Sequence, residues 1–542
     1  MYLRGTFTWQ IMSVLVLIAV AVLGLALLLP PELLVLVVAV GAMALVYFSG
    51  AVYLLGRPEW LPERFDRVPI VLGIGFPLVV VGVVGYHFRA LLTPIAVVFM
   101  LGLLFVFLYY WLVVPLALFQ KVRHQSVTPE PAAWPAVTVL VPAYNEEHYV
   151  GRCLRSIHAS TYPGVLSVVV VDDGSTDGTY AEACAEAGEE TRVIRTANGG
   201  KHAALNAALE HTETELVVSV DADSTVHPDA ITELVRDFER HDGVGAIAGN
   251  VKVDNRGSLV ANLQALEYVV GINTFRRAFD LFGAVTVVPG SLGAFRRDVL
   301  DEVHGYSADT VTEDFDLTIE ILKRGYAIHA SEAIVYTEGP DTWRDLYAQR
   351  RRWFQGNLQT VLKHREVFVD SRFGVLHRVA FPYIFLSMSA LPLLGLLVLV
   401  LIVSSVFVGG SGLLLQLAVF FVLLQVLLSA LAIQIEGEDL RLAVLAPFSL
   451  FGYKQFQDVV LLRSLYALWS DRGGATEWLK PTRVRQRATD GAGVPVPIAG
   501  PGSANRAIAS ASERDSGPTS EADVDPLGVS EMDVDPLGIS EE

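Results

Sequence analysis

The chain has 542 residues, of which 52% are hydrophobic, and its formal net charge at pH 7 is −18. A chain of this length accommodates several domains. The negative charge argues against a nucleic acid as partner, because the phosphate backbone would be repelled. The two cysteines, Cys153 and Cys184, stand in no metal-binding or redox spacing, so we expect two free thiols and no disulfide framework.

Four apolar runs precede residue 120, and each is near or above the roughly 20 residues that span a bilayer. They occupy residues 11–29, 33–55, 69–86 and 91–119. Pro30-Pro31-Glu32 follows the first run, which is not typical of a cleavable signal peptide. The second loop carries three arginines, and Lys121 and Arg123 follow the fourth run. The positive-inside rule places both in the cytoplasm, so we expect about four membrane helices at 1–128 and then a cytoplasmic domain.

Residues 129–340 alternate strand-like and helical stretches. Strands are expected at 137–141, 168–171, 192–196 and 217–220, with helices ending near Ile157 and spanning about 180–187 and 202–210. This alternation is typical of a doubly wound, mostly parallel α/β sheet. Ligands of such sheets bind beyond the carboxyl ends of the strands. Three loops therefore bring polar side chains to one edge of the predicted sheet.

Two of these loops suit the base of a nucleotide sugar. Tyr144, in the loop with Glu146, can cover the face of a base. Asp172 and Asp173 end the next strand, and a carboxylate can accept the imide proton of uracil. We therefore expect these four residues to bind the nucleotide.

The other predicted site residues suit a diphosphate and a metal ion. Lys201 follows Gly199-Gly200 at a predicted helix N-terminus, where backbone amides and the helix dipole favour phosphate. Asp221 and Asp223 bracket one small residue, an arrangement that suits Mg²⁺ or Mn²⁺. Taken alone, an Asp-x-Asp pair is more often a turn after a strand, and a lysine such as Lys201 is more often a solvated surface residue. Their order along one chain favours the site.

The C-terminal part returns to apolar composition. Residues 341–378 are expected to form interfacial amphipathic helices, and 379–483 a second transmembrane region with apolar runs at 379–408 and 413–435. A third run, 440–469, is broken by Pro447 and by polar residues at 454–458, so it either spans the bilayer or forms a bent or interfacial element. Residues 490–542 hold eleven acidic and two basic residues, and 484–542 are expected to be a disordered acidic tail.

The motifs together resemble those of processive family 2 glycosyltransferases with the GT-A fold, which include hyaluronan, cellulose and poly-N-acetylglucosamine synthases. Thr312-Glu313-Asp314 is similar to the TED motif, whose Asp is the catalytic base in that family. Residues 349–353, Gln-Arg-Arg-Arg-Trp, read as QxxRW, which lies there beside the acceptor and the diphosphate. Family segments are also seen at 249–251, Gln264, Glu267-Tyr268 and 290–297, closest to the poly-N-acetylglucosamine branch. Residues 478–483 resemble a Trp/Arg motif that reaches back to the active site.

The resemblance implies further roles. Glu313, Asp314, Gln349, Arg352 and Trp353 are expected to be catalytic, with Asp316 a secondary candidate for the base. Arg350 and Arg351 are expected to anchor the helix at the membrane. Trp343 is either an interfacial belt residue or a platform for the acceptor, to which Gly290 and Ser291 also contribute. Without the resemblance, Asp314 would be only an acid favoured by a helix N-terminus.

The implied function is a membrane-embedded, inverting β-glycosyltransferase that elongates a polysaccharide from a UDP-sugar and helps to export it. UDP-N-acetylglucosamine is the favoured donor, Mg²⁺ or Mn²⁺ is the expected cofactor, and the expected location is the plasma membrane with the catalytic domain in the cytoplasm. One alternative is transfer of a single sugar to a polyprenyl phosphate or another lipid. A second is a transporter or receptor with a degenerate, non-catalytic domain.

Overall fold

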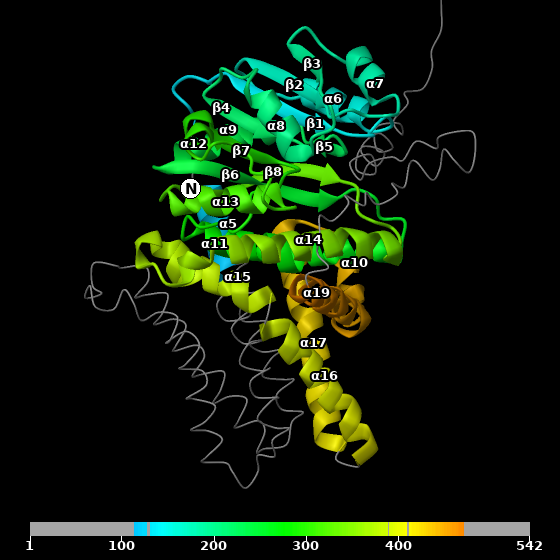
Figure 1. Cartoon of the computed structure of the whole chain (residues 1–542). Helices are drawn as coiled ribbons and strands as arrows, with labels where there is room; N and C mark the ends of the chain where they lie inside the picture. The colour runs from blue at the N-terminus through cyan, green and yellow to red at the C-terminus, as the bar shows by residue number, and fades with distance from the viewer. Residues whose placement is uncertain (1–112, 127–129, 389, 409–410, 471–542) are drawn as a thin grey trace, which may run out of the picture. The chain divides into compact units, whose positions relative to one another are not determined.

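The computed structural model describes residues 113–126, 130–388, 390–408 and 411–470. Three predictions lie outside these residues: the first membrane helices, the acidic tail and the motif at 478–483. The described residues contain a sheet of eight strands in the order β3-β2-β1-β4-β7-β6-β8-β5 (Figure 1). The strands are β1 Val137–Ala143, β2 Leu166–Asp172, β3 Thr191–Arg195, β4 Leu216–Ser219, β5 Ser224–Val226, β6 Val244–Val253, β7 Gly293–Arg296 and β8 Ala327–Thr337.

The sheet is parallel where the sequence predicted strands, and mixed elsewhere. β1 pairs in parallel with β2 and β4, β2 with β3, and β6 with β8. β7 pairs antiparallel with both β4 and β6, and β5 pairs antiparallel with β8. The expectation of a mostly parallel sheet is therefore confirmed, and β5 and β7 add antiparallel pairs that the sequence did not predict. β5 and β7 are only three and four residues long, too short to show a strand period in the sequence.

Helices cover both faces of the sheet. Val139 and Val141 of β1 pack in one hydrophobic cluster with α6 (Val150–His158) and α9 (Ala230–Arg240). Leu140 lies in a second cluster with α8 (Lys201–Leu209) and α13 (Glu313–Lys323). Because successive side chains of a strand point to opposite faces, burial on both faces accounts for the continuous apolar runs of the sequence. The other helices of this domain are α7 Thr179–Ala185, α10 Leu259–Glu267, the π-helix η4 Tyr268–Asn273, α11 Thr274–Asp280 and α12 Arg297–Glu302.

A long helix, α14 (Trp343–Lys363), follows β8, and apolar helices come after it. The short 3-10 helices Arg365–Phe368 and Ser371–Phe373 and the π-helix Leu376–Ala380 lead to α15 Phe381–Met388, α16 Ala390–Val408 and α17 Ser411–Glu436. Within the described ranges, one helical stretch, Leu376–Leu397, is long and apolar enough to cross a bilayer.

The segment at 440–469 is bent. It contains the 3-10 turn η8 Leu440–Leu445, α18 Ala446–Phe448, the turn η9 Ser449–Tyr453 and α19 Lys454–Trp469. Within η9, Phe451 and Gly452 leave helical geometry, and Gly452 has a φ of 107°, which favours glycine. α19 then lies along α14 (Figure 1), where the rings of Phe456 and Trp343 are 5.1 Å apart. Of the two forms that the sequence left open, the structure has the bent one.

Candidate active site

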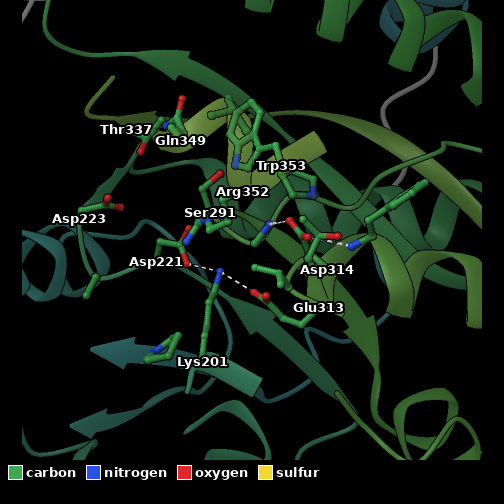
Figure 2. A pocket seen from close by; sticks show the side chains of 18 of the residues that line it. Lys201, Asp221, Asp223, Ser291, Glu313, Asp314, Thr337, Gln349, Arg352 and Trp353 are labelled. Carbon is green, nitrogen blue, oxygen red and sulfur yellow. Dashed lines mark hydrogen bonds and ion pairs between the residues drawn. The ribbon is translucent and has the colours of Figure 1, made fainter. Parts of the chain in front are cut away.

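A cavity of about 410 Å³ lies beyond the carboxyl ends of the parallel strands and against α14. It brings together most of the residues that the sequence singled out (Figure 2). Those that line it are Tyr144, Glu146, Asp173, Lys201, Asp221, Asp223, Gly290, Ser291, Glu313, Asp314, Gln349, Arg352 and Trp353.

Asp172 and Trp343 lie outside this lining. Asp172 is fully buried, accepts a hydrogen bond from the Ser175 amide (3.1 Å) and lies 3.1 Å from the Arg195 guanidinium. Asp172 therefore stabilises the loop after β2 through these contacts. Trp343, the first residue of α14, is 42% exposed and packs against Phe456 of α19.

The glycine-rich turn before α8 binds a side chain of the protein itself. The amides of Gly199 and Gly200 each donate to the carboxylate of Asp173, at 2.8 Å. These amides were expected to bind a diphosphate, and this expectation is wrong, because Asp173 already occupies them. Burial raises the pKa of Asp173, although the two amides act in the opposite direction.

Lys201 is held at the centre of the cavity by two carboxylates. Its Nζ lies 2.7 Å from Oδ1 of Asp221 and 3.0 Å from Oε1 of Glu313 (Figure 2). Burial alone would lower the pKa of Lys201, but Asp221, Glu313 and Asp314 outweigh it and raise the pKa well above its ordinary value. Gly290 allows this placement, because a Cβ there would collide with Nζ. The glycine of the predicted acceptor segment thus makes room for the lysine.

Asp314, the second residue of α13, keeps a carboxylate that is ready to take a proton. Its Oδ2 accepts from the Gly290 amide (3.3 Å) and its Oδ1 from the Phe315 amide (2.8 Å). Burial and the neighbouring Glu313 charge raise the pKa of Asp314 to about 6, against the opposing effect of Lys201. A carboxyl with a pKa near the working pH is suited to general-base catalysis.

Asp316 does not share this position. Its side chain is buried and accepts from Nε2 of His364 (2.9 Å) and Nζ of Lys363 (2.8 Å), both at the end of α14. It therefore ties α13 to α14 and is removed as a candidate base. The two helices also meet at Gly356, where a Cβ would lie 2.6 Å from the side chain of Thr312.

One face of α14 forms a wall of the cavity. Gln349, Arg352, Trp353 and Asn357 all line it, at the spacing of three and four that places residues on one helix face. Oε1 of Gln349 is buried with no hydrogen-bond partner among the described residues, so it can accept from a ligand. The sequence reasoning missed Asn357, although its position four residues after Trp353 was the signal.

Arg350 is not a membrane anchor, which corrects the expectation for it. Its side chain is 1% exposed and donates from Nη2 to Oε2 of Glu267 at 2.6 Å. The run of three arginines suggested one shared role, but the helix turns Arg350 into the protein and Arg352 toward the cavity.

The charge of the cavity favours a cation. Seven carboxyl side chains line it against two cationic ones, Lys201 and Arg352. A diphosphate alone would therefore be repelled. Mg²⁺ is commonly held by one or two protein carboxylates together with substrate phosphates. Asp221 and Asp223 supply such carboxylates on the cavity wall, so the residues present fit a divalent ion.

A second group of potential metal ligands lies away from the cavity. His241, Asp280 and His329 present ligand atoms within 4.8 Å of one another. The two imidazole rings are stacked in parallel, 3.7 Å apart with 3° between their planes, so their in-plane lone pairs do not converge on one point. Asp280 already accepts from His329, Gln120 and the Ala330 amide. We therefore associate the cation with the cavity.

Comparison with known proteins agrees with this geometry. Residues 135–356 match a family described as glycosyltransferase like family 2. A poly-beta-1,6-N-acetyl-D-glucosamine synthase of Staphylococcus epidermidis is 29% identical over 247 residues, which are 45% of this chain and 58% of that protein. The synthase of the same name from Staphylococcus aureus (strain COL) is 29% identical over 231 residues, 42% of this chain and 56% of the relative. The chain thus spans less than three-fifths of the length of these curated relatives.

One similar solved structure is a mannosyltransferase from Pyrobaculum calidifontis in complex with GDP-Man and Mn²⁺. It is 22% identical, with a TM-score of 0.46, and the match covers 66% of this chain and 99% of that one.

Proposed function

We propose that this chain elongates a polysaccharide from a UDP-sugar, with inversion at the anomeric carbon. The proposal starts from the family 2 glycosyltransferase domain at residues 135–356. One observation carries the proposal. A single cavity joins the carboxylates after β4, the half-buried Asp314 carboxyl with its raised pKa and the QxxRW face of α14. Because the relatives are named for polymers of N-acetylglucosamine, UDP-N-acetylglucosamine is the proposed donor.

The donor lies across the strand ends. Tyr144 covers the uracil, and Asp173 lies at the same end of the cavity. Lys201 and Arg352, the two cations of the lining, bind the diphosphate. Asp221 and Asp223 hold Mg²⁺ or Mn²⁺, which supplies positive charge to the departing diphosphate when it is bound.

The transfer is a single displacement. Asp314 accepts the proton of an acceptor hydroxyl as the oxygen of that hydroxyl forms a bond to the anomeric carbon. The bond between that carbon and the diphosphate breaks in the same step, and its electron pair leaves with UDP. Lys201 and Arg352 remain near the leaving group, where their charges stabilise it. Asp314 then releases its proton to solvent.

The acceptor lies at the α14 end of the cavity. Trp353 offers an aromatic face to a sugar ring, while Gln349 and Asn357 offer hydrogen bonds to its hydroxyls. The apolar stretch Leu376–Leu397 and exposed apolar side chains of α16, such as Phe407 (84% exposed), support insertion in a bilayer. We place the catalytic domain on the cytoplasmic side of the plasma membrane, with export of the product through the membrane helices.

The test is UDP release by the full chain, purified in detergent, with Mn²⁺ and with UDP-N-acetylglucosamine, UDP-glucose or UDP-glucuronate. Product sizing follows. Asp314→Asn removes the base and keeps the shape of the side chain, so we expect the rate to fall by about 10²- to 10⁴-fold. Asp301→Asn is the matched control, because Asp301 is an exposed acid on α12 outside the cavity lining.

A long polymer from one donor, abolished in Asp314→Asn and kept in Asp301→Asn, is the expected result. A product with a single added sugar would replace the polymerase with the lipid-acceptor alternative. Turnover that survives in Asp314→Asn would remove Asp314 as the base. A folded protein that consumes none of the three donors would overturn the proposed function.

A further inference from the structure

The indole of Trp353 is placed by a buried cation. The guanidinium of Arg350 lies 4.1 Å from the centroid of the Trp353 ring. The ring of Tyr268, another residue of the cavity wall, is tilted against the same indole at 6.5 Å. A cation on an aromatic face is attracted by the negative charge of that face. The orientation of Trp353 therefore depends on where Arg350 is held.

Arg350 is held in turn by one carboxylate. Oε2 of Glu267, the last residue of α10, accepts from Nη2 of Arg350 and from the hydroxyl of Tyr453, each at 2.6 Å. A buried guanidinium needs such a partner, because its desolvation is otherwise uncompensated. The hydroxyl of Tyr453 fixes which way the carboxylate faces. Glu267 thus connects three elements: α10, α14 and η9.

Tyr453 belongs to the bent C-terminal segment. It is buried and directly follows Gly452, the residue with a φ of 107° at the kink. It also directly precedes α19, which packs on the N-terminal part of α14 through Trp343 and Tyr347. The bend at Gly452 is therefore what brings the Tyr453 hydroxyl to Glu267.

We propose that Glu267 and Tyr453 are positioning residues for Trp353. They hold Arg350 against the indole, so the acceptor end of the cavity has its working shape only when the segment at 440–469 is seated on α14. This inference rests on the proposed function, since it takes Trp353 as the face that binds the acceptor sugar. The donor end does not share the dependence, because Lys201 pairs with Asp221 and Glu313 and not with Glu267, Arg350 or Tyr453.

The sharpest variant is Tyr453→Phe, which removes one hydroxyl and keeps the ring. Misplacing an acceptor group slightly reduces transfer strongly, so we expect the KM for short oligosaccharide acceptors to rise by roughly 5- to 20-fold and the product to become shorter. The KM for the UDP-sugar and the slow hydrolysis of the donor by water stay unchanged. Arg350→Lys keeps the charge but loses the planar contact with the indole. We expect it, too, to raise the KM for the acceptor and to leave the KM for the UDP-sugar unchanged.

The matched control is Tyr347→Phe. Tyr347 also joins α14 to α19, through a 3.5 Å hydrogen bond from Arg463, but it lies outside the cavity lining. Wild-type acceptor KM in Tyr347→Phe together with a raised one in Tyr453→Phe is the expected pair of results.

Two results would overturn the positioning role alone. In one, Tyr453→Phe behaves as Tyr347→Phe does. In the other, it loses donor hydrolysis and transfer equally, as a general loss of structure would cause. A wild-type protein that turns over no UDP-sugar would instead overturn the proposed function, and the role of Trp353 with it.

Discussion

Two neighbouring carboxyls at the start of α13 have different environments. Glu313 is paired with the ammonium of Lys201 at 3.0 Å, while the Asp314 carboxylate accepts from the backbone N–H groups of Gly290 and Phe315. Burial then raises the pKa of Asp314 to about 6. When the surroundings of two adjacent acids differ in this way, the acid whose charged form is less stabilised is the better base. The structure therefore distinguishes two residues that the sequence motif lists side by side.

The raised pKa predicts the acid side of the pH profile. A protonated Asp314 has no free carboxylate to accept a proton, so kcat/KM for UDP release should decrease as the pH falls through about 6. An Asp at its ordinary value of 3.8 would keep the rate constant to much lower pH. Initial rates measured across the acidic range at low donor concentration give this profile.

Lys201→Gln supplies the control for this assignment. The ammonium lowers the pKa of Asp314, so its removal should move the acid limb of the remaining activity to higher pH. A profile without a limb near pH 6 would contradict the prediction, and so would a limb that Lys201→Gln leaves in place.

At the scale of elements, α13 and α14 are locked together at two points. Gly356 lies against Thr312, just before Glu313 and Asp314, and Asp316 binds His364 and Lys363 at the end of α14. Asp314, the proposed base, is on one helix and Trp353 is on the other. Base and acceptor wall therefore keep their spacing only while this contact is close.

Gly356→Ala should separate the two helices. The added methyl would lie 2.6 Å from the side chain and 2.9 Å from the backbone nitrogen of Thr312, and a backbone atom cannot move without moving the motif. We expect kcat to fall by about 10- to 100-fold. The loss in free energy of unfolding should be less than the strain of about 1–3 kcal/mol, because Ala has a better helix propensity than Gly and offsets part of that strain. Initial rates and thermal unfolding in detergent measure the two effects.

Gly271→Ala is the comparison for this variant. Gly271 is also helical, but the nearest atom to an added Cβ is 3.9 Å away, in Glu267. It should keep wild-type activity. Equal kcat values for the two alanine variants would show that the contact of α14 with Thr312 does not set the rate.

At the scale of the molecule, one buried arginine joins segments from both sides of the catalytic domain. Arg277 of α11 forms ion pairs with Glu332 of β8 and with Glu436, the last residue of α17. It also donates to Gln120 of α5 (Val114–Ser126) at 3.2 Å. Arg277 is 1% exposed and the side chain of Glu436 is fully buried. The helix before the domain and an apolar helix after it thus meet at one guanidinium.

Glu436→Gln should loosen this connection. The change removes one of the two negative charges that compensate Arg277, and breaking a buried pair costs on the order of 3–5 kcal/mol. Because Gln keeps part of the hydrogen bonding, we expect a loss of about 2–3 kcal/mol, seen as a lower unfolding temperature in detergent. Transfer activity below that temperature should persist.

Asp439→Asn controls for the loss of an acid at the same end of α17. Asp439 is exposed and its hydrogen bond to the Arg441 amide suits Asn equally. A similar unfolding temperature for both variants would contradict the role given to Arg277.

The sequence predicted what local pattern and motif order determine. The strands that precede Tyr144, Asp173 and Asp221 followed from apolar runs, and the cavity residues from the motifs at 312–314 and 349–353. It did not predict the role of Arg350, whose burial depends on Glu267 and Tyr453, which are distant in sequence. Nor did it predict that Asp173 occupies the amides of Gly199 and Gly200, since each motif offered a ligand site when considered alone.

The strand β7 has a consequence for how the chain can be shortened. Within the described sheet, β1 to β4 form one half and β6, β8 and β5 the other, and β7 is the strand hydrogen-bonded to both. A fragment that ends before Gly293 keeps the loops that we propose to bind the donor, but leaves β4 and β6 with open edges. Unpaired edges recruit strands from other molecules. Such a fragment would aggregate instead of folding as a soluble nucleotide-binding half, so a useful minimal catalytic unit has to continue through β8 and α14.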